Sequence, residues 1–576
     1  MSKKSPKEIL WVSILVSLSL MVLVSLFLWP ATGWLVRLQL ISQILPIAAQ
    51  DREADERRVA EANPLDYQIQ LARTLTTPYP VDSTRPMNSL PNSTVKVQRL
   101  HELATRFPNE PSVYAHALRF ATMGAVLLRR QEQDELLAVP PVNSAAKVRQ
   151  IKPEDLEAFE RDAANGERLA PDNAYFPLMR AIGFYAVHKD AEAIAAIHRA
   201  GLKTRYEDFT SMEFSCVDKF STLAHGQRGV IARTAMAAAI LFPHYAQIRA
   251  LSRMGTVSAI HMELNGNAEE GFAIRRDLMR AGALMREQGH SLICNLVGIA
   301  VTAIPVGRPG GTPAIKSPDD YSKLTEDQKI QRSREKREKY YRYIASIGHA
   351  DEARWIEAEA DAGMQVKAAC KKIGAVGPFS TGALLQTGCW WLLNLLTLTN
   401  AIGLLILGAA AGLASTITPK KHLKLCRGLF GLIIAGVFAL WLFNVERGLT
   451  NWVTAPIQMF QAIGNMQDNN TDMHGAEMLL QIGAMTLALA LPLLLMLIIG
   501  ILSMTMKVPL ATGLGRGLRG LALPLACLLF IAYGLLVVGT ARSETNLNTV
   551  LESNAAHEGQ TIATMLGQKW PGATLR

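Results

Sequence analysis

The stretch Ile9–Trp29, ILWVSILVSLSLMVLVSLFLW, decides the first element of the fold because it is apolar throughout and carries no charge. A bilayer core about 30 Å thick needs about 20 apolar residues in a helix, so the stretch predicts a transmembrane helix. The basic sequence MSKKSPK before it also suits a signal peptide, with PIAAQ (Pro46–Gln50) as the nearest cleavage-site candidate. We favour an uncleaved anchor, because the stretch is longer than a usual signal sequence and no small-residue cleavage site follows it directly.

Four more apolar stretches in the C-terminal third predict a bundle of membrane helices. They lie at Trp390–Ala414, around Phe430–Phe443, at Met478–Met506 and at Leu521–Thr540, and none contains Asp, Glu, Lys, Arg or His. Ion-coupled transporters usually place such residues near mid-membrane, where they are costly and functional. The charge-free stretches therefore argue against an ion or proton pump.

Basic segments beside the spans predict the orientation of the chain. Cytoplasmic loops collect Lys and Arg, most clearly where the loops are short. Thr418–Gly428 and Lys507–Gly520 each carry several Lys or Arg and no acidic residue, and the N-terminus carries Lys3, Lys4 and Lys7. Five spans place all three segments in the cytoplasm, and they place the middle of the chain and its C-terminus outside.

These features together predict an all-α membrane protein with an N-terminal transmembrane anchor, an extracytoplasmic helical-hairpin domain and a C-terminal four-helix transmembrane bundle. The expected segments are a cytoplasmic N-terminus (1–8), transmembrane helix 1 (9–29), an extracytoplasmic helical-repeat domain (30–305), a Pro/Gly linker with a charged helix (306–382), transmembrane helix 2 (383–415), a basic cytoplasmic loop (416–428), transmembrane helix 3 (429–445), an outer loop (446–477), transmembrane helix 4 (478–506), a second basic cytoplasmic loop (507–519), transmembrane helix 5 (520–541) and an outer tail (542–576). The expected location is the inner (plasma) membrane of a cell.

The charge of the chain is interpreted through its position. The 576 residues carry a net charge of +10, with 49% hydrophobic and 19% charged residues. In a soluble protein such a charge could indicate nucleic-acid binding. Here much of the positive excess lies in short loops beside the spans, so we interpret it as an orientation signal and expect no nucleic-acid partner.

The cysteines give no metal or redox motif. The six are Cys216, Cys294, Cys370, Cys389, Cys426 and Cys527. None forms a CxxC pair, so a zinc ribbon or thioredoxin-like site has no support. If the large domain faces an oxidising compartment, Cys216 and Cys294 are candidates for a disulfide, and the alternative is two buried free thiols.

The segment Asn173–Gly201, NAYFPLMRAIGFYAVHKDAEAIAAIHRAG, has the spacing of two helices that meet at His188-Lys189-Asp190. It resembles a tetratricopeptide repeat. The matching positions are Pro171 with Asp172-Asn173-Ala174 at the turn between repeats, Ala181 and Phe184 in the first helix, and Ala193 and Ala200 in the second, whereas Ile197 replaces the usual aromatic residue. The resemblance covers this one unit well.

Segments with weaker similarity to this unit occur on either side of it. Gly266–Gly282 resembles the second helix of the unit and would pair with Tyr245–Asn265, and Leu100–Ala121 has a similar turn at Pro108-Asn109. The resemblance implies a degenerate stack of helical hairpins over about residues 60–305. Such stacks present a concave face that binds peptides or protein partners. The alternative is an irregular helical domain without a groove.

Two further segments have helical patterns. A Pro/Gly linker at Ile304–Pro318 precedes a charged helix expected over Glu326–Lys372, with a capping box at Thr325 and Gln328. Its charges suit either a solvated helix or a contact surface. The tail Ser543–Arg576 has apolar residues at helical spacing, which predicts an amphipathic helix lying against the outer domain or against the bilayer.

The search for catalytic chemistry yields no motif. There is no HExxH, no GxSxG and no P-loop, and His101-Glu102 lacks a second histidine. Asp468, Asp472, His474 and Glu477 have residue types that could bind a divalent cation, but such clusters in polar loops are usually solvated, as is Arg308 in the linker. We therefore assign no catalytic, cofactor-binding or metal-binding residue and expect no cofactor.

These observations favour a non-enzymatic, membrane-anchored scaffold or partner-binding subunit of an envelope complex. Its expected partners are the lipid bilayer and, through the helical-repeat domain, other membrane or extracytoplasmic proteins. A component of a membrane transporter (permease-like) is the first alternative, although no ATPase domain is present. A membrane-bound enzyme with a site shared between the outer domain and the bundle is the second, and it requires converging titratable residues.

Overall fold

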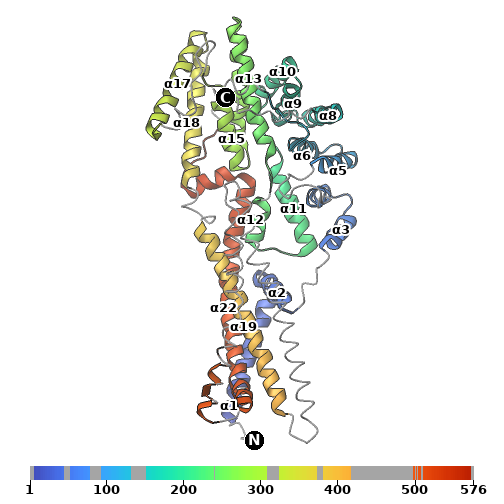
Figure 1. The fold of residues 1–576 in the computed structure, drawn as a ribbon, viewed down its shortest axis with the longest axis vertical. Helices are drawn as coiled ribbons and strands as arrows, with labels where there is room; N and C mark the ends of the chain where they lie inside the picture. The colour runs from blue at the N-terminus through green and yellow to red at the C-terminus, as the bar shows by residue number, and fades with distance from the viewer. Residues whose placement is uncertain are drawn as a thin grey trace. The chain divides into compact units, whose positions relative to one another are not determined.

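The described part of the chain is helical. The computed structural model describes residues 6–44, 52–77, 93–130, 151–238, 240–307, 324–372, 381–416 and 510–572, with a few single positions between 494 and 507. Within these residues the regular structure is α-helix (Figure 1), and the β-type pairing is one isolated bridge between Asn173 and Arg205. The chain divides into two compact units, called here the bundle unit and the hairpin unit. The all-α expectation is therefore confirmed for the described residues.

The bundle unit comprises Met1–Arg52, Gln227–Ala235 and Pro378–Thr549. Its helices are α1 (Pro6–Leu28), α2 (Pro30–Ile44), α12 (Val230–Ala238), α19 (Thr381–Thr416) and the first part of α22 (Leu510–Met565). Among the described residues, three helices are long and apolar enough to cross a membrane: Leu10–Leu28, Trp390–Ala409 and Gly520–Met565. Membrane association is thus supported. The expected third span and the outer loop that follows it lie outside the described residues, as does most of the fourth span.

Apolar side chains of the bundle unit divide between an inner core and an outer surface. Trp11, Met21 and Leu28 of α1 are exposed, which fits a helix face that meets lipid. The inner core joins helices far apart in sequence; it consists of Leu26, Leu35, Val36, Trp391, Leu398, Tyr533 and Val537. The Tyr533 hydroxyl donates a hydrogen bond of 2.6 Å to Oε1 of Gln39. Helix α2, which the sequence analysis placed at the start of the outer domain, therefore packs with the apolar helices.

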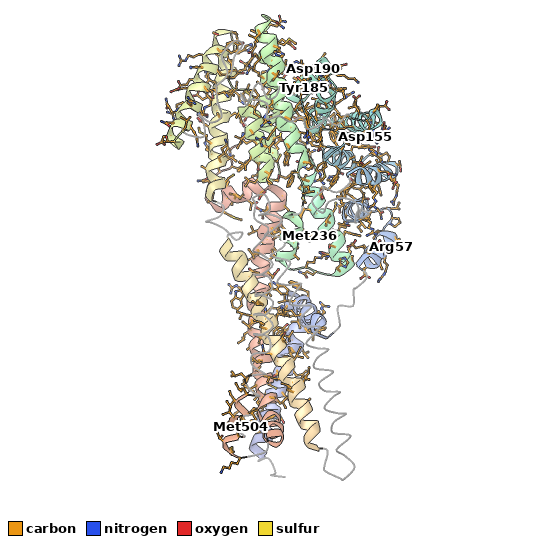
Figure 2. All side chains as sticks on the ribbon, viewed as in Figure 1. Arg57, Asp155, Tyr185, Asp190, Met236 and Met504 are labelled. Carbon is orange, nitrogen blue, oxygen red and sulfur yellow. The ribbon has the colours of Figure 1, made fainter. Side chains whose placement is uncertain are left out.

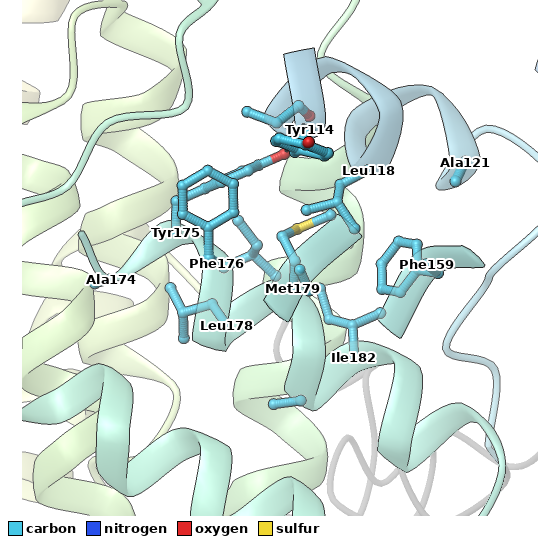
Figure 3. Close-up of a cluster of buried hydrophobic side chains, with 14 of the residues drawn as sticks. Tyr114, Leu118, Ala121, Phe159, Ala174, Tyr175, Phe176, Leu178, Met179 and Ile182 are labelled. Atoms are coloured by element: carbon cyan, nitrogen blue, oxygen red, sulfur yellow. Dashed lines mark hydrogen bonds between the residues drawn. The ribbon is translucent and has the colours of Figure 1, made fainter. Parts of the chain in front are cut away.

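The hairpin unit comprises Glu53–Gly226, Met236–Gly377 and Val550–Arg576. Its helices are α3 (Arg52–Ala62), α4 (Tyr67–Thr76), α5 (Ser93–Arg106), α6 (Pro111–Ala121), α8 (Pro153–Leu169), α9 (Tyr175–Ala186), α10 (Asp190–Gly201), α11 (Thr210–His225), α13 (Pro243–Leu264), α14 (Ala268–Gln288), α15 (Leu292–Ala303), α17 (Glu326–Ser346) and α18 (Ala350–Lys372). Helices that follow one another closely in sequence pack as pairs, for example α5 with α6, α9 with α10 and α13 with α14. One apolar core runs through most of these pairs. Figure 3 shows the part of this core around α6, α8 and α9.

The segment Asn173–Gly201 folds as two helices joined at the expected place. α9 ends at Ala186, α10 begins at Asp190, and His188 between them has a φ of 61°. Asp190 Oδ1 accepts a hydrogen bond of 2.5 Å from Arg130, whose guanidinium carbon lies 6.0 Å from the centre of the Tyr185 ring. Figure 2 labels Asp190 and Tyr185. The side chain of Asn173 holds the entry turn, because its Nδ2 donates to the carbonyl of Glu207 at 2.8 Å.

The charged segment forms two helices, where the sequence analysis expected one. The capping box is confirmed: Gln328 N–H donates to Oγ1 of Thr325 at 3.3 Å, and Thr325 N–H donates to Oε1 of Gln328 at 2.9 Å. The helix stops because Gly348 adopts a φ of 95°, which favours glycine. α17 and α18 then form a hairpin whose buried Tyr340 and Ile356 join a core with α14; its buried members are Phe272, Met279, Val306, Tyr340, Ile344, Ala353 and Ile356.

The C-terminal tail packs against protein, which decides between the two expectations for it. α22 is interrupted at His557, whose φ of −162° and ψ of 96° are not helical. Glu558 then caps α15, since its Oε2 accepts the backbone N–H of Leu292 at 2.7 Å. Trp570 is buried in a cluster with Ile299, Val366 and Ala563. The end of the chain is thus part of the hairpin unit.

Candidate binding groove

A groove of about 230 Å³ lies between the hairpin α14–α15 and the hairpin α17–α18. Its lining combines apolar, small and cationic side chains: Met279, Ile299, Thr302, Ala303, Val306, Ser333, Lys336, Arg337, Trp355, Ile356, Glu359, Ala360, Gly363, Met364 and Lys367. On α18 the lining positions recur every three or four residues, which is the spacing of one helix face. The groove is therefore formed by the facing stripes of four helices.

Close approach of α18 to α15 shapes the base of the groove. A Cβ atom at Gly363 would lie 3.2 Å from Cγ2 of Ile299, which is tighter than ordinary contact. Gly363 and the small side chain of Ala360 let the two helices come together and leave space beside them. Trp355 and Met364 border that space. The apolar part of the groove thus results from small residues placed opposite large ones.

A buried ion pair closes the polar side of the base. Arg286 donates to both carboxylate oxygens of Glu359, at 2.5 and 3.0 Å, and both side chains are buried. Arg286 also donates to the carbonyls of Pro571 at 2.7 Å and Gly572 at 3.0 Å. Charge-assisted, bidentate bonds of this kind are among the stronger ones in proteins. Among the described residues that line the groove, the one carboxylate is therefore paired with a guanidinium.

Three cationic side chains lie at the rim of the groove. Lys336 and Lys367 are exposed, and Arg337 is half-buried. Burial raises the pKa of the nearby Tyr341 to about 12; the positive charge of Arg337 opposes this rise, whereas Glu357 and Asp361 add to it. Those two carboxylates lie near Tyr341 and do not line the groove. The described lining residues therefore carry more positive than negative charge.

A second polar cluster lies in the core of the hairpin unit, around Asp208. Burial alone would raise the pKa of Asp208, but hydrogen bonds from His244, Tyr245 and Thr210 outweigh it and hold that pKa below its usual range. The Tyr245 hydroxyl donates at 2.5 Å and His244 Nε2 lies at 3.2 Å from the same oxygen. His116, fully buried nearby, has a pKa well below 6.5 because burial disfavours its charged form. This cluster is enclosed and joins α6, α11 and α13.

Polar residues also line the contact between α19 and α22 in the bundle unit. The Trp391 indole donates to Oε1 of Glu544 at 2.6 Å, and the backbone N–H of Val230 donates to Oε2 at 2.7 Å. Thr387 and Ser543 share a hydrogen bond of 2.8 Å one turn away. Glu544 therefore caps the start of α12 and binds α19 at the same time. Glu544 is not among the candidate residues predicted from the sequence.

The cysteines expected as a possible pair are both free. Cys216 and Cys294 are buried thiols. Cys294 Sγ lies 3.9 Å from the carbonyl oxygen of Met285, whereas Cys216 lies on α11 near Lys219 and Asp66. Burial raises the pKa of Cys216 to about 12 and that of Cys294 well above 9. The disulfide hypothesis is therefore replaced by the alternative of two buried free thiols, because the two side chains have different surroundings.

The other residues that the sequence analysis considered fall into two groups. His101 Nε2 lies 2.7 Å from Oδ2 of Asp162, a contact that joins α5 to α8. Arg308 and the acidic loop cluster (Asp468, Asp472, His474 and Glu477) lie outside the described residues. Within the described residues, no group of three or more His, Cys, Asp or Glu side chains is placed to hold a metal ion.

The charged helix is a candidate contact surface on sequence grounds, but its pattern does not predict the groove. Lys336 and Arg337 lie on that helix, whereas Glu359 and Lys367 lie on the helix after the break. The signal that could have found the site is the glycine in IASIGHADEA, which predicts a hairpin of two charged helices.

The fold and the groove define an all-α protein with membrane-capable helices and a helical unit that carries a partly open, cationic groove. Comparison of the chain with protein-family models, with curated proteins and with solved structures finds no match.

Proposed function

We propose that this chain is a non-enzymatic, membrane-anchored subunit of an envelope complex and that its hairpin unit binds a partner protein. The observation that carries the proposal is the groove between α14–α15 and α17–α18, where apolar side chains meet a cationic rim. Protein interfaces combine an apolar centre with a polar rim in this way. Sites on packed helices also hold their geometry better than sites on loops.

The membrane helices supply the anchor in this proposal. Five spans with a cytoplasmic N-terminus would place the hairpin unit and the C-terminal tail outside the cytoplasm, in agreement with the basic segments at 416–428 and 507–519. A topology reporter inserted after the exposed Leu202 tests this orientation. We expect activity from a reporter that works only outside the cytoplasm, and a signal from a cytosol-specific reporter would contradict it.

Photo-crosslinking tests partner binding by the hairpin unit. A photoreactive residue in place of Met364, which is 47% exposed at the groove, should crosslink a protein partner in native membranes. The matched control carries the same residue in place of Leu535 of α22, which is 75% exposed on the bundle unit. We expect a discrete protein adduct, in near-stoichiometric amounts, from the Met364 position and lipid adducts from the Leu535 position.

Native mass spectrometry of the chain, extracted in mild detergent, tests independently whether it forms a complex with a partner protein. A stoichiometric complex is the expected result. A monomer in every detergent tested, together with no protein adduct from the Met364 position, would contradict the proposed function.

A further inference from the structure

We infer that the groove between α14–α15 and α17–α18 takes an acidic polypeptide segment that carries one bulky apolar side chain. The inference rests on the proposed function, because it names the chemistry of the partner at that site. Charge, size and shape of the groove support it independently.

The charge of the groove indicates the sign of the charge on the bound segment. The rim carries Lys336, Arg337 and Lys367, and the one carboxylate among the described lining residues, Glu359, is paired with Arg286. A positive potential of this kind attracts carboxylates and speeds their association. Two or more acidic side chains would therefore flank the bound apolar residue.

Size restricts what can enter the apolar part. The groove has about 230 Å³. An engineered cavity of about 150 Å³ holds one benzene ring, and pockets for small ligands usually begin at about 300 Å³. The volume therefore suits one aromatic or branched aliphatic side chain with its adjoining backbone. It is small for a whole cofactor or a full-length acyl chain.

The walls offer specific contacts to such a side chain. Trp355 and Met364 border the space, and Ile299 with Gly363 forms its base. Aromatic rings and thioethers are favourable neighbours for an inserted ring. Because Ala360 is small, the face of α18 is indented at that point. The apolar anchor would enter beside Ala360.

The groove is already formed before any partner binds. The Arg286–Glu359 pair ties α14 to α18, and the capping box of Thr325 and Gln328 fixes the start of α17. Preorganisation of this kind lowers the entropic cost of binding. A short segment should therefore bind measurably by itself.

Fluorescence anisotropy tests the inference on the full chain in nanodiscs of phosphatidylcholine. The probe is a fluorescein-labelled peptide with the order Glu-Asp-Phe-Asp-Glu, and saturable binding in the micromolar range is expected. The same peptide with alanine in place of phenylalanine, and one with lysine in place of every acid, should each bind at least tenfold more weakly. Raising the salt concentration from 50 to 300 mM should also weaken binding, because exposed charges are screened.

Two pairs of variants locate the binding site. Lys336→Glu with Arg337→Glu and Lys367→Glu should weaken binding at least about tenfold, since each exposed ion pair contributes modestly and reversal adds repulsion. The charge-matched control changes Arg332, Arg334 and Arg342 to Glu; all three are exposed on α17 and none lines the groove. Ala360→Trp should block the groove and weaken peptide binding. The control is Ala358→Trp, at an exposed position on the same helix, and this variant should bind the peptide normally. Circular dichroism of each variant confirms that it is folded.

The outcomes separate this inference from the proposed function. If a partner crosslinks at the Met364 position but neither groove variant weakens peptide binding, the inference is wrong and the proposed function stands. If dihexanoyl phosphatidylglycerol displaces the probe at a lower concentration than unlabelled peptide does, the groove is a lipid site and the inference is overturned. Loss of peptide binding in the groove variants, with the two controls unchanged, supports the inference.

Discussion

Arg286 and Glu359, which are 73 positions apart in sequence, form a buried two-pronged ion pair with contacts of 2.5 and 3.0 Å. Arg286 also holds the carbonyls of Pro571 and Gly572, so one side chain joins α14, α18 and the end of the chain. The pair is enclosed by protein, because Glu359 is 3% exposed and Arg286 is fully buried. It therefore supports both the groove and the C-terminal tail.

The first prediction concerns this pair. Glu359→Leu leaves a buried guanidinium without its carboxylate, which should lower the free energy of unfolding by about 3–5 kcal/mol. Glu359→Leu combined with Arg286→Met removes both charges and should recover most of that loss. Denaturant unfolding in mild detergent, followed by circular dichroism, measures the difference. Equal stability of the single variant and the native chain would show that the pair is not needed.

The second prediction concerns Glu544 in the bundle unit. Glu544→Ala removes the acceptor for the Trp391 indole and for the N–H of Val230, leaving two donors unpaired. We expect a loss of about 1–3 kcal/mol, seen as a lower midpoint of thermal unfolding. Glu544→Gln keeps one acceptor oxygen, so its loss of stability should be smaller than that of Glu544→Ala. Glu552→Ala, which changes an exposed carboxylate on the same helix, is the matched control and should shift the midpoint little. Equal midpoints of thermal unfolding for Glu544→Ala and Glu552→Ala would contradict a stabilising role of Glu544.

The third prediction is a pH dependence of the hairpin unit. His116 is fully buried with both ring nitrogens lacking a hydrogen-bond partner, and its pKa in the folded chain is well below 6.5. The unfolded chain takes up this proton first, so stability should fall as the pH drops below about 6.5. Asp208 acts in the same direction at lower pH, because its folded-state pKa is depressed and its contribution is lost as it becomes protonated.

His116→Leu isolates the contribution of the histidine. The leucine leaves no unpaired nitrogen, so the variant should be at least as stable as the native chain at pH 7.5. Its thermal midpoint should fall less between pH 7.5 and pH 5. The measurement is differential scanning fluorimetry at matched ionic strength. A fall equal to that of the native chain would exclude His116 as its source.

The fourth prediction concerns the thiols. Because burial raises the pKa of Cys216 to about 12, its thiolate fraction at pH 8 is on the order of 10⁻⁴, and Cys294 is shifted in the same direction. Both should react with a thiol reagent only after unfolding, and Cys370, which is half-buried, should react sooner. Peptide mapping by mass spectrometry identifies the labelled residues. A linked Cys216–Cys294 peptide pair would refute the free-thiol assignment.

Local patterns predicted several features well. The capping box at Thr325 and Gln328, and the turn between α9 and α10, depend on residues within one helical turn of each other. The start and length of the apolar helix Leu10–Leu28 follow from hydrophobicity alone. The break at Gly348 was missed although its signal is local, because the charge pattern continues smoothly across it.

The candidate site was beyond sequence reasoning for a different reason. The lining comes from α14, α15, α17 and α18, and which faces of these helices meet is decided by packing of the whole unit. Lys336 looks the same in sequence as the other charges of α17, and Lys367 as those of α18. Only the packing of the four helices brings them together with Ile356 and Gly363 in the lining of one groove.

The sequence by itself determined that this chain is helical and that parts of it are long and apolar enough to cross a membrane. It also determined where several helices begin and end. These properties depend on residues that are only a few positions apart in the chain. The tertiary structure decided which buried charges meet, how α2 joins the bundle unit, and that the tail completes the hairpin unit. The bond from Arg286 to the carbonyl of Pro571 spans 285 positions, and no local pattern encodes such a contact. It forms only when separate helix faces are packed together and a buried guanidinium must be paired.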